Sequence, residues 1–416
     1  MNILKFFTAG SVDDGKSTLI GRLLYDTDSI LADQLEALQQ SNRKNDDGTI
    51  DLAILTDGLR AEREQGITID VAYKYFQTDK RKFIIADTPG HIQYTRNMVT
   101  GASTAKLAII LIDARNGVVE QTIRHSYLVS LLGIEHVVVC LNKMDMVDYS
   151  ETVYNAITDK YKTLAAELNL RDVTFIPVSA LKGDNVVNES EHMPWYKGRS
   201  LLHFLESVDV ESGPEYNLAR MPVQWVIRPQ TDELHDYRGY AGRILSGSFK
   251  VNDKVTVLPS GNSSVVERIE IFDQHPQEAH AGQSVTLHLK DNIDISRGDV
   301  LVNSDHMPQN SQVIEADVCW MDARPLDESI TYLLQHNSKI TKCKIREIVH
   351  KVDINTLEKQ EAYDFKLNDI GRVILKTADE LAFDLYTENK ANGAAILIDS
   401  RTNLTAAALM FRAVAD

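Results

Sequence analysis

The chain has 416 residues, with 44 Lys plus Arg against 60 Asp plus Glu and a formal net charge of −16. An acidic excess of this size opposes a sequence-independent grip on nucleic acid or on an anionic membrane surface, so neither is an expected partner. The length predicts two or three domains, and 43% hydrophobic residues are enough to give each domain a core.

The first half of the chain alternates short apolar runs with stretches of helical period, the pattern of a parallel sheet covered on both faces. The expected strands are Ile3–Ala9, Phe83–Ala86, Leu107–Ile112, Val137–Leu141 and Thr174–Val178. The expected helices are Ser17–Leu24, Gln121–Leu132 and Tyr149–Leu168. This alternation predicts a doubly wound α/β domain with a mostly parallel sheet over residues 1–210.

Residues 26–66 form a connection that is too long for an ordinary loop. Leu31, Leu35 and Leu38 keep helical spacing, and residues 41–48 are polar. We expect a part-ordered segment that is functional or disordered.

After residue 210 the pattern changes to short strand-like runs interrupted by Asp, Asn, Gly and Pro, which favours small β-barrels. The strands expected in a first barrel, residues 218–307, are Pro222–Ile227, Arg238–Leu245, Lys254–Leu258, Val265–Phe272 and Ser284–Leu289. The strands expected in a second barrel, residues 310–416, are Ile340–Val349, Glu361–Leu367, Ile370–Thr377 and Ala395–Ile398.

The cysteines, Cys140, Cys319 and Cys343, include no C-x-x-C pair, which indicates neither a disulfide framework nor a thiol metal site. No apolar run approaches the roughly 18 residues that span a bilayer, and the N-terminus lacks the pattern of a signal peptide. We therefore expect a protein of the reducing cytoplasm.

The segment Gly10–Ser17 (GSVDDGKS) matches G-x-x-x-x-G-K-[ST] and lies between an expected buried strand and a helix, as a phosphate-binding loop must. Lys16 is expected to reach the β and γ phosphates, and the Ser17 hydroxyl to bind Mg²⁺. The helix N-terminus adds partial positive charge. The alternative is a Gly-rich turn with a solvated lysine. The predicted phosphate-binding residues are Gly10, Ser11, Val12, Asp13, Asp14, Gly15, Lys16, Ser17 and Thr18.

The segment Asp87–His91 (DTPGH) follows an expected strand, so Asp87 lies at a carboxyl-terminal sheet edge, where open α/β sheets bind ligands. Its carboxylate can hold the metal through a water, and the Gly90 N–H can face a γ-phosphate. Thr68, within REQGITI, could reach both Mg²⁺ and the γ-phosphate. Alone, the first motif is an ordinary turn and Thr68 a strand-start residue; beside a phosphate loop they complete a triphosphate site.

The segment Asn142–Asp145 (NKMD) ends an expected strand and predicts base selectivity. The Asp145 carboxylate can accept N1–H and the 2-amino group of guanine, two donors that adenine lacks. Asn142 can bond N7 and tie the loops together, and the Lys143 stem can cover the purine face. In the later segment Ser179-Ala180-Leu181, a backbone N–H can serve the guanine O6. Alone, each of these motifs could be a polar strand end.

Together, these five motifs and the β-rich remainder resemble the translation-factor class of GTPases over the whole chain. The resemblance implies a P-loop GTPase domain followed by two β-barrels, with GTP and Mg²⁺ bound. It implies metal contacts from Ser17, Thr68 and Asp87, catalytic roles for Lys16 and Thr68, and a His91 that orients the hydrolytic water.

Several stretches resemble more closely the GTPase subunit of bacterial sulfate adenylyltransferase. Ser11 and Asp14 stand where elongation factors usually have histidines. Ile92 departs from the sulfurylase pattern, which often has an acidic residue at that position. The similar stretches are Leu24–Ile30, Asp57–Thr68, Lys80–Asp87, Tyr94–Ser103, Asp236–Gly242 and Ile293–Asp299.

This resemblance implies GTP hydrolysis coupled to the transfer of AMP from ATP to sulfate by a smaller catalytic subunit, as the first step of sulfate assimilation. The partner is that subunit, in a heterodimer or larger assembly, with no nucleic acid or membrane. Two alternatives stay open: an elongation-type GTPase that binds aminoacyl-tRNA and the ribosome, and a scaffold that binds GTP without hydrolysing it.

Overall fold

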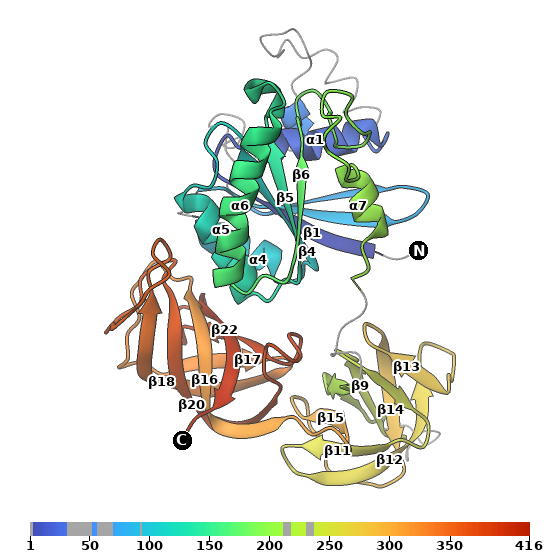
Figure 1. The fold of residues 1–416 in the computed structure, drawn as a ribbon. Helices are drawn as coiled ribbons and strands as arrows, with labels where there is room; N and C mark the ends of the chain where they lie inside the picture. The colour runs from blue at the N-terminus through green and yellow to red at the C-terminus, as the bar shows by residue number, and fades with distance from the viewer. Residues whose placement is uncertain (1–2, 31–51, 56–69, 92–93, 211–217, 230–236) are drawn as a thin grey trace. The chain divides into compact units, whose positions relative to one another are not determined.

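A six-stranded sheet forms the centre of the first of two units, Met1–Glu211 (Figure 1). The computed structural model describes residues 3–30, 52–55, 70–91, 94–210, 218–229 and 237–416. The strand order is β2-β3-β1-β4-β5-β6, and all neighbours run parallel except β2 with β3. The strands are β1 (Ile3–Ala9), β2 (Ala72–Gln77), β3 (Lys82–Asp87), β4 (Leu107–Asp113), β5 (His136–Asn142) and β6 (Asp172–Pro177).

A helix follows each of the parallel strands along the chain. Every residue of the central strand β4 is buried, because apolar side chains cover both faces of the sheet. The described helices are α1 (Lys16–Asp26), α4 (Thr95–Ala102), α5 (Glu120–Leu131), α6 (Glu151–Glu167) and α7 (Leu201–Ser207), with 3-10 helices at Leu52–Leu55 and Met144–Val147.

The five strands and three helices expected in this unit are present, with ends that differ by no more than two residues. Strand β2 and the short helices α4 and α7 were not expected. Strand β2 lies at the sheet edge, and its outward Tyr73 and Tyr75 are exposed. Polar and aromatic residues alternate along β2, so this strand lacks the continuous apolar run that marks the buried strands. Within the described ranges, no helix is long and apolar enough to cross a membrane.

The second unit, Ser212–Asp416, holds two seven-stranded sheets, each around its own apolar core. The first has the order β7-β15-β11-β12-β14-β9-β8, and an antiparallel bridge between Arg220 and Ser246 joins β7 to the chain after β9. Its strands, with the small β10–β13 pair, are β7 (Arg220–Pro222), β8 (Trp225–Ile227), β9 (Gly239–Arg243), β10 (Ser248–Lys250), β11 (Lys254–Leu258), β12 (Asn262–Glu270), β13 (Glu278–His280), β14 (Ser284–Leu289) and β15 (Val300–Asn303).

The second sheet has the order β17-β21-β22-β16-β20-β18-β19, and an additional β17–β18 pairing closes it into a barrel. The long strand β18 has two bulges in its pairing with β20, and bulges give a strand the curvature that closure needs. The strands are β16 (Gln309–Trp320), β17 (Tyr332–His336), β18 (Lys339–Val352), β19 (Lys359–Gln360), β20 (Ile370–Phe383), β21 (Ala394–Ile398) and β22 (Thr405–Val414).

Two expectations for the barrels were wrong. The run Pro222–Ile227 is split between β7 and β8, which lie at opposite ends of one sheet, because the chain turns between them. The run Glu361–Leu367 is a loop: Phe365 is buried in the core, but Tyr363 is 81% exposed. One buried anchor in an exposed segment does not make the period-2 pattern of a strand.

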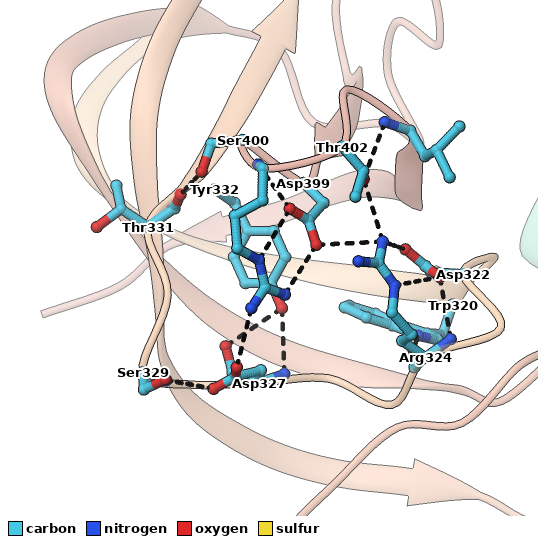
Figure 2. A network of polar contacts seen from close by, with 12 residues as sticks. Trp320, Asp322, Arg324, Asp327, Ser329, Thr331, Tyr332, Asp399, Ser400 and Thr402 are labelled. Carbon is cyan, nitrogen blue, oxygen red and sulfur yellow. Dashed lines mark hydrogen bonds and ion pairs between the residues drawn. The ribbon is translucent and has the colours of Figure 1, made fainter.

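A chain of ion pairs, in which aspartate and arginine side chains alternate, connects the loops at one end of this barrel (Figure 2). Arg324 contacts Asp322 at 2.6 Å and Asp399 at 3.3 Å. Arg401 contacts Asp399 at 3.0 Å and Asp327 at 3.6 Å. Asp399 therefore links the loop after β16 to the turn between β21 and β22.

Candidate functional site

The phosphate loop turns from the end of β1 into α1. Gly15 precedes the helix at φ 92°, a left-handed conformation that favours glycine, and an added Cβ would collide with the Asn142 side chain. The buried Lys16 ammonium donates to the carbonyl oxygens of Gly10 and Ser11, both at 2.9 Å. Burial lowers the pKa of Lys16, and Asp87, Asp14 and Asp13 oppose that shift. The phosphate loop is therefore folded around the Lys16 ammonium, which these two hydrogen bonds hold in place.

Asp14 closes the loop from within. Its Oδ2 accepts from the Ser11 N–H at 2.5 Å, across the turn of the loop. Burial raises the pKa of Asp14, while this hydrogen bond and the Lys16 charge act in the opposite direction. Of the other predicted loop residues, Val12 and Asp13 are exposed, whereas Ser17 and Thr18 lie half-buried in the first turn of α1.

Asn142, at the end of β5, joins two loops that are far apart in sequence. Its Nδ2 donates to the carbonyl of Asp14 at 2.7 Å, and its Oδ1 accepts from the N–H of Ala180 at 2.9 Å. The side chain is 2% exposed. The structure thus brings the phosphate loop and the segment Ser179-Ala180-Leu181 to one edge of the sheet, as expected for the carboxyl ends of parallel strands.

Asp145 lies half-buried in the 3-10 helix that follows Asn142, and its Oδ1 accepts from the Ser179 hydroxyl at 2.6 Å. Arg22 of α1 donates to the carbonyls of Ala180, at 3.1 Å, and Leu181, at 2.5 Å. These bonds orient the carboxylate and fix the segment whose N–H groups can face a base.

Lys143 is held by a carboxylate that the sequence analysis did not single out. Its Nζ lies 3.0 Å from Oδ2 of Asp113, which also binds the Arg115 guanidinium at 2.6 Å. Burial alone would raise the pKa of Asp113, but hydrogen bonds from Arg115 and Lys143 outweigh it and lower this pKa to about 2. Asp113 ends β4 as Asp87 ends β3, so its strand-end position was a signal that could have identified it.

Asp87 and Gly90 lie close to the phosphate loop. Asp87 is 1% exposed, and its Oδ1 accepts from the Thr8 hydroxyl at 3.3 Å. A Cβ on Gly90 would lie 2.5 Å from the Gly10 carbonyl oxygen and 2.5 Å from Lys16 Nζ, so glycine is required for this approach. The next residue, His91, is exposed, and its ring centroid is 6.1 Å from that of Tyr94.

Thr68 lies outside the described residues, as do Gly66, Ile92 and most of the 26–66 connection. The other predicted site residues lie at the ends of β3 and β5, in the turns that follow β1, β3, β5 and β6, in the first turn of α1 or in the 3-10 helix after β5. Three residues that support them were missed: Arg22, Asp113 and Gln121, whose Nε2 donates to the Gly90 carbonyl at 3.3 Å. Arg22 and Gln121 lie within helices, where a sequence pattern gives no sign of a polar contact to a distant loop.

Comparison with known proteins identifies the family. The elongation factor Tu GTP binding domain matches residues 1–226, elongation factor Tu domain 2 matches residues 240–302, and the GTP-eEF1A C-terminal domain-like family matches residues 313–411. Sulfate adenylyltransferase subunit 1 of Bacteroides fragilis (strain YCH46) is 53% identical over 98% of this chain and 85% of its own length. The chain belongs to the sulfate adenylyltransferase subunit 1 family.

A second member, from Aliarcobacter butzleri (strain RM4018), is 51% identical over 99% of this chain and 87% of its own length. The likeness therefore includes both barrels as well as the GTP-binding domain. The expected fold class, an α/β P-loop GTPase domain followed by β-barrels, is confirmed by the matches and by the observed sheets.

Proposed function

We propose that the chain hydrolyses GTP and couples this reaction to the formation of adenosine 5′-phosphosulfate and pyrophosphate from ATP and sulfate by a smaller partner subunit. The observation that carries the proposal is identity above 50% over nearly the whole chain to proteins named sulfate adenylyltransferase subunit 1. A subunit 1 implies a second subunit, which would supply the AMP transfer. The proposed role is the first step of sulfate assimilation in the cytoplasm, where the three free, buried cysteines of the chain would stay reduced.

The proposed guanine selectivity rests on Asp145. Its carboxylate is held by Ser179 through Oδ1, in an orientation that suits acceptance from N1–H and the 2-amino group of guanine. Asn142 would bond N7, Lys143 would cover the base, and the backbone of Ser179, Ala180 and Leu181 would meet O6. Replacing Asp145 with Asn should remove the preference for guanosine over inosine triphosphate, measured by competition for a fluorescent nucleotide.

The proposed phosphate site uses residues from Gly10 to Thr18, with Lys16 on the β and γ phosphates and the Gly90 N–H toward the γ-phosphate. The fixed Lys16 ammonium and the close approach of Gly90 to it support this assignment. His91, at the edge of the same site, would orient the attacking water. The exposed position of His91, directly after Gly90, supports this assignment.

The donor set fits Mg²⁺, which prefers hard oxygen ligands and keeps several waters. Asp87 offers a buried carboxylate at the carboxyl end of β3, oriented by the Thr8 hydroxyl, and Ser17 offers a hydroxyl in the first turn of α1. With Thr68 these residues would hold the ion. When bound, Mg²⁺ would neutralise charge on the β and γ phosphates.

The test is the rate of GTP hydrolysis by the full chain, with and without the smaller subunit, ATP and sulfate. We expect the complete mixture to raise turnover and to form adenylylsulfate only when GTP is hydrolysed. A rate that none of these additions changes would refute the coupling. Retention of aminoacyl-tRNA on a filter, dependent on GTP, would instead support the elongation-type alternative.

A further inference from the structure

Gln121, in the first turn of α5, reaches across to the segment that precedes His91. Its Nε2 donates to the carbonyl oxygen of Gly90 at 3.3 Å. The Gly90 carbonyl and the His91 N–H belong to one planar peptide unit. The hydrogen bond therefore fixes the plane from which the His91 side chain begins.

Arg124 fixes the orientation of the Gln121 amide. Its Nη1 donates to Gln121 Oε1 at 3.1 Å, across one turn of α5. Because a guanidinium can only donate, the amide oxygen must face Arg124, which leaves the amide nitrogen for the Gly90 carbonyl. The Arg124 side chain is 10% exposed and lies 3.6 Å from the Glu120 carboxylate. A chain of contacts thus runs from Glu120 through Arg124 and Gln121 to Gly90.

The phosphate loop also limits the position of Gly90. Its α-carbon lies so close to Lys16 and to the Gly10 carbonyl that a methyl group there would be 2.5 Å from both. Gly90 is therefore constrained both by the phosphate loop and by Gln121. Displacement of the Gly90–His91 peptide from this position has to distort the Gln121 hydrogen bond.

We propose that Gln121 is a positioning residue for GTP hydrolysis, which holds the Gly90–His91 peptide so that the His91 imidazole reaches the attacking water, and that Arg124 acts through Gln121. This inference rests on the proposed role of His91. The geometry gives the reason for a specific effect on the chemical step: Gln121 contacts the backbone of the hydrolytic segment, and Asp145 and Asn142, the base-binding residues, are bonded elsewhere.

The experiment measures single-turnover hydrolysis of GTP with Mg²⁺ by the full chain for wild type, Gln121→Leu, Gln121→Glu and His91→Ala. We expect Gln121→Leu to lower the hydrolysis rate about 10- to 100-fold, because a displacement near 1 Å costs up to about 100-fold. The affinity for GDP, which lacks the γ-phosphate that Gly90 would face, should stay within about twofold of wild type. Gln121→Glu should be at least as slow, because it sets a carboxylate oxygen against the Gly90 carbonyl.

The double variant His91→Ala with Gln121→Leu decides whether Gln121 acts through His91. If it does, the double variant is no slower than His91→Ala alone, since residues that act as a unit are not additive. Ser130→Ala is the matched control: this hydroxyl lies on the same helix but donates to the Leu168 carbonyl at 2.7 Å. Hydrolysis by this variant should equal that of wild type, and unfolding midpoints of all variants establish that they are folded.

The outcomes separate this inference from the function it rests on. A slow His91→Ala together with a wild-type rate for Gln121→Leu overturns the positioning role alone. A double variant that is slower than His91→Ala by the full Gln121→Leu factor also overturns it. A His91→Ala variant that hydrolyses GTP at the wild-type rate removes the role of His91 from the proposed function, and this inference falls with it.

Discussion

Replacing Asn142 with Ala should weaken the fold of the first unit and its grip on nucleotide together. The substitution removes two hydrogen bonds, at 2.7 and 2.9 Å, and leaves the Asp14 carbonyl and the Ala180 N–H without their partner in a site where the side chain is 2% exposed. An unsatisfied buried group costs about 1 to 3 kcal/mol, so the free energy of unfolding should fall by about 2 to 6 kcal/mol. Nucleotide binding must then order two loops that are no longer joined. If about 2 kcal/mol of that loss appears in binding, GDP affinity falls roughly 30-fold.

Asn185 provides a matched control. It is also 2% exposed, its Nδ2 donates to the Pro177 carbonyl at 2.9 Å, and its Oδ1 accepts from the Ser190 N–H at 2.8 Å. Its φ of 55° adds about 1 kcal/mol of strain for alanine. Asn185→Ala should therefore destabilise the unit at least as much, but none of its lost bonds touches the phosphate loop.

The assay is urea unfolding of both variants combined with the dissociation rate of a fluorescent GDP analogue. We expect similar losses of unfolding free energy, with fast dissociation for Asn142→Ala and a much smaller change for Asn185→Ala. Equal acceleration in both variants would mean that affinity follows general stability and that the Asn142 tie has no special role. Wild-type dissociation from Asn142→Ala would refute the reasoning outright.

Three further predictions concern buried charge. Asp384→Asn should cost the second unit about 3 to 5 kcal/mol in urea unfolding, because it leaves the 1% exposed Arg220 without its carboxylate at 2.8 Å; the paired change Arg220→Met with Asp384→Leu should cost less. Burial, with the Lys16 and Arg124 charges, lowers the pKa of His125 to about 3, so below the unfolded value of about 6.5 only the unfolded chain takes up its proton. As the pH is lowered below that unfolded value, the free energy of unfolding of the first unit should decrease by up to about 1.4 kcal/mol per pH unit. His125→Leu should flatten that slope in urea midpoints measured between about pH 7.5 and 5. Hydrogen bonds from Arg401 lower the pKa of Asp399 to about 2 even though burial opposes them, so its stabilisation is present above about pH 4 and is lost toward pH 2; Asp399→Asn should cost about 1 to 2 kcal/mol at neutral pH, since both guanidinium partners are near half exposed.

The sequence predicted the strands whose residues are buried without interruption. Strand β4 is apolar up to its final residue, Asp113, because both faces of the sheet are covered, and a run of seven buried residues has few other interpretations. Edge strand β2 was missed because the exposed Tyr73 and Tyr75 and the lysine between them interrupt the apolar signal. The strand predicted at Glu361–Leu367 was wrong for the opposite reason. Phe365 is buried within a loop, and in the sequence a single buried apolar residue resembles part of a strand.

The candidate site was predicted where its chemistry lies in one contiguous motif and missed where it depends on long-range bonds. Lys16 and Asp145 follow from local patterns that fix both residue type and backbone shape. Arg22, which bonds carbonyls some 158 residues later in the chain, leaves no local trace. Asp113 falls between these cases: it ends a strand beside Asn142, so its place at the sheet edge was predictable but its pairing with Lys143 was not.

The polar contacts inside the second unit bear on how a nucleotide signal could reach a partner. The guanidinium of Arg220, on the first barrel, donates through Nε and Nη2 to both oxygens of Asp384, on the second, and through Nη1 to the Ala219 and His306 carbonyls. Asn389 of the second barrel donates to Ser246 of the first at 2.8 Å. Separating the barrels would expose a buried charge and break these bonds together, which makes that separation costly. The two barrels are therefore expected to move together as one rigid body. A nucleotide-dependent switch that acts on a partner bound to either barrel would need to move only that body.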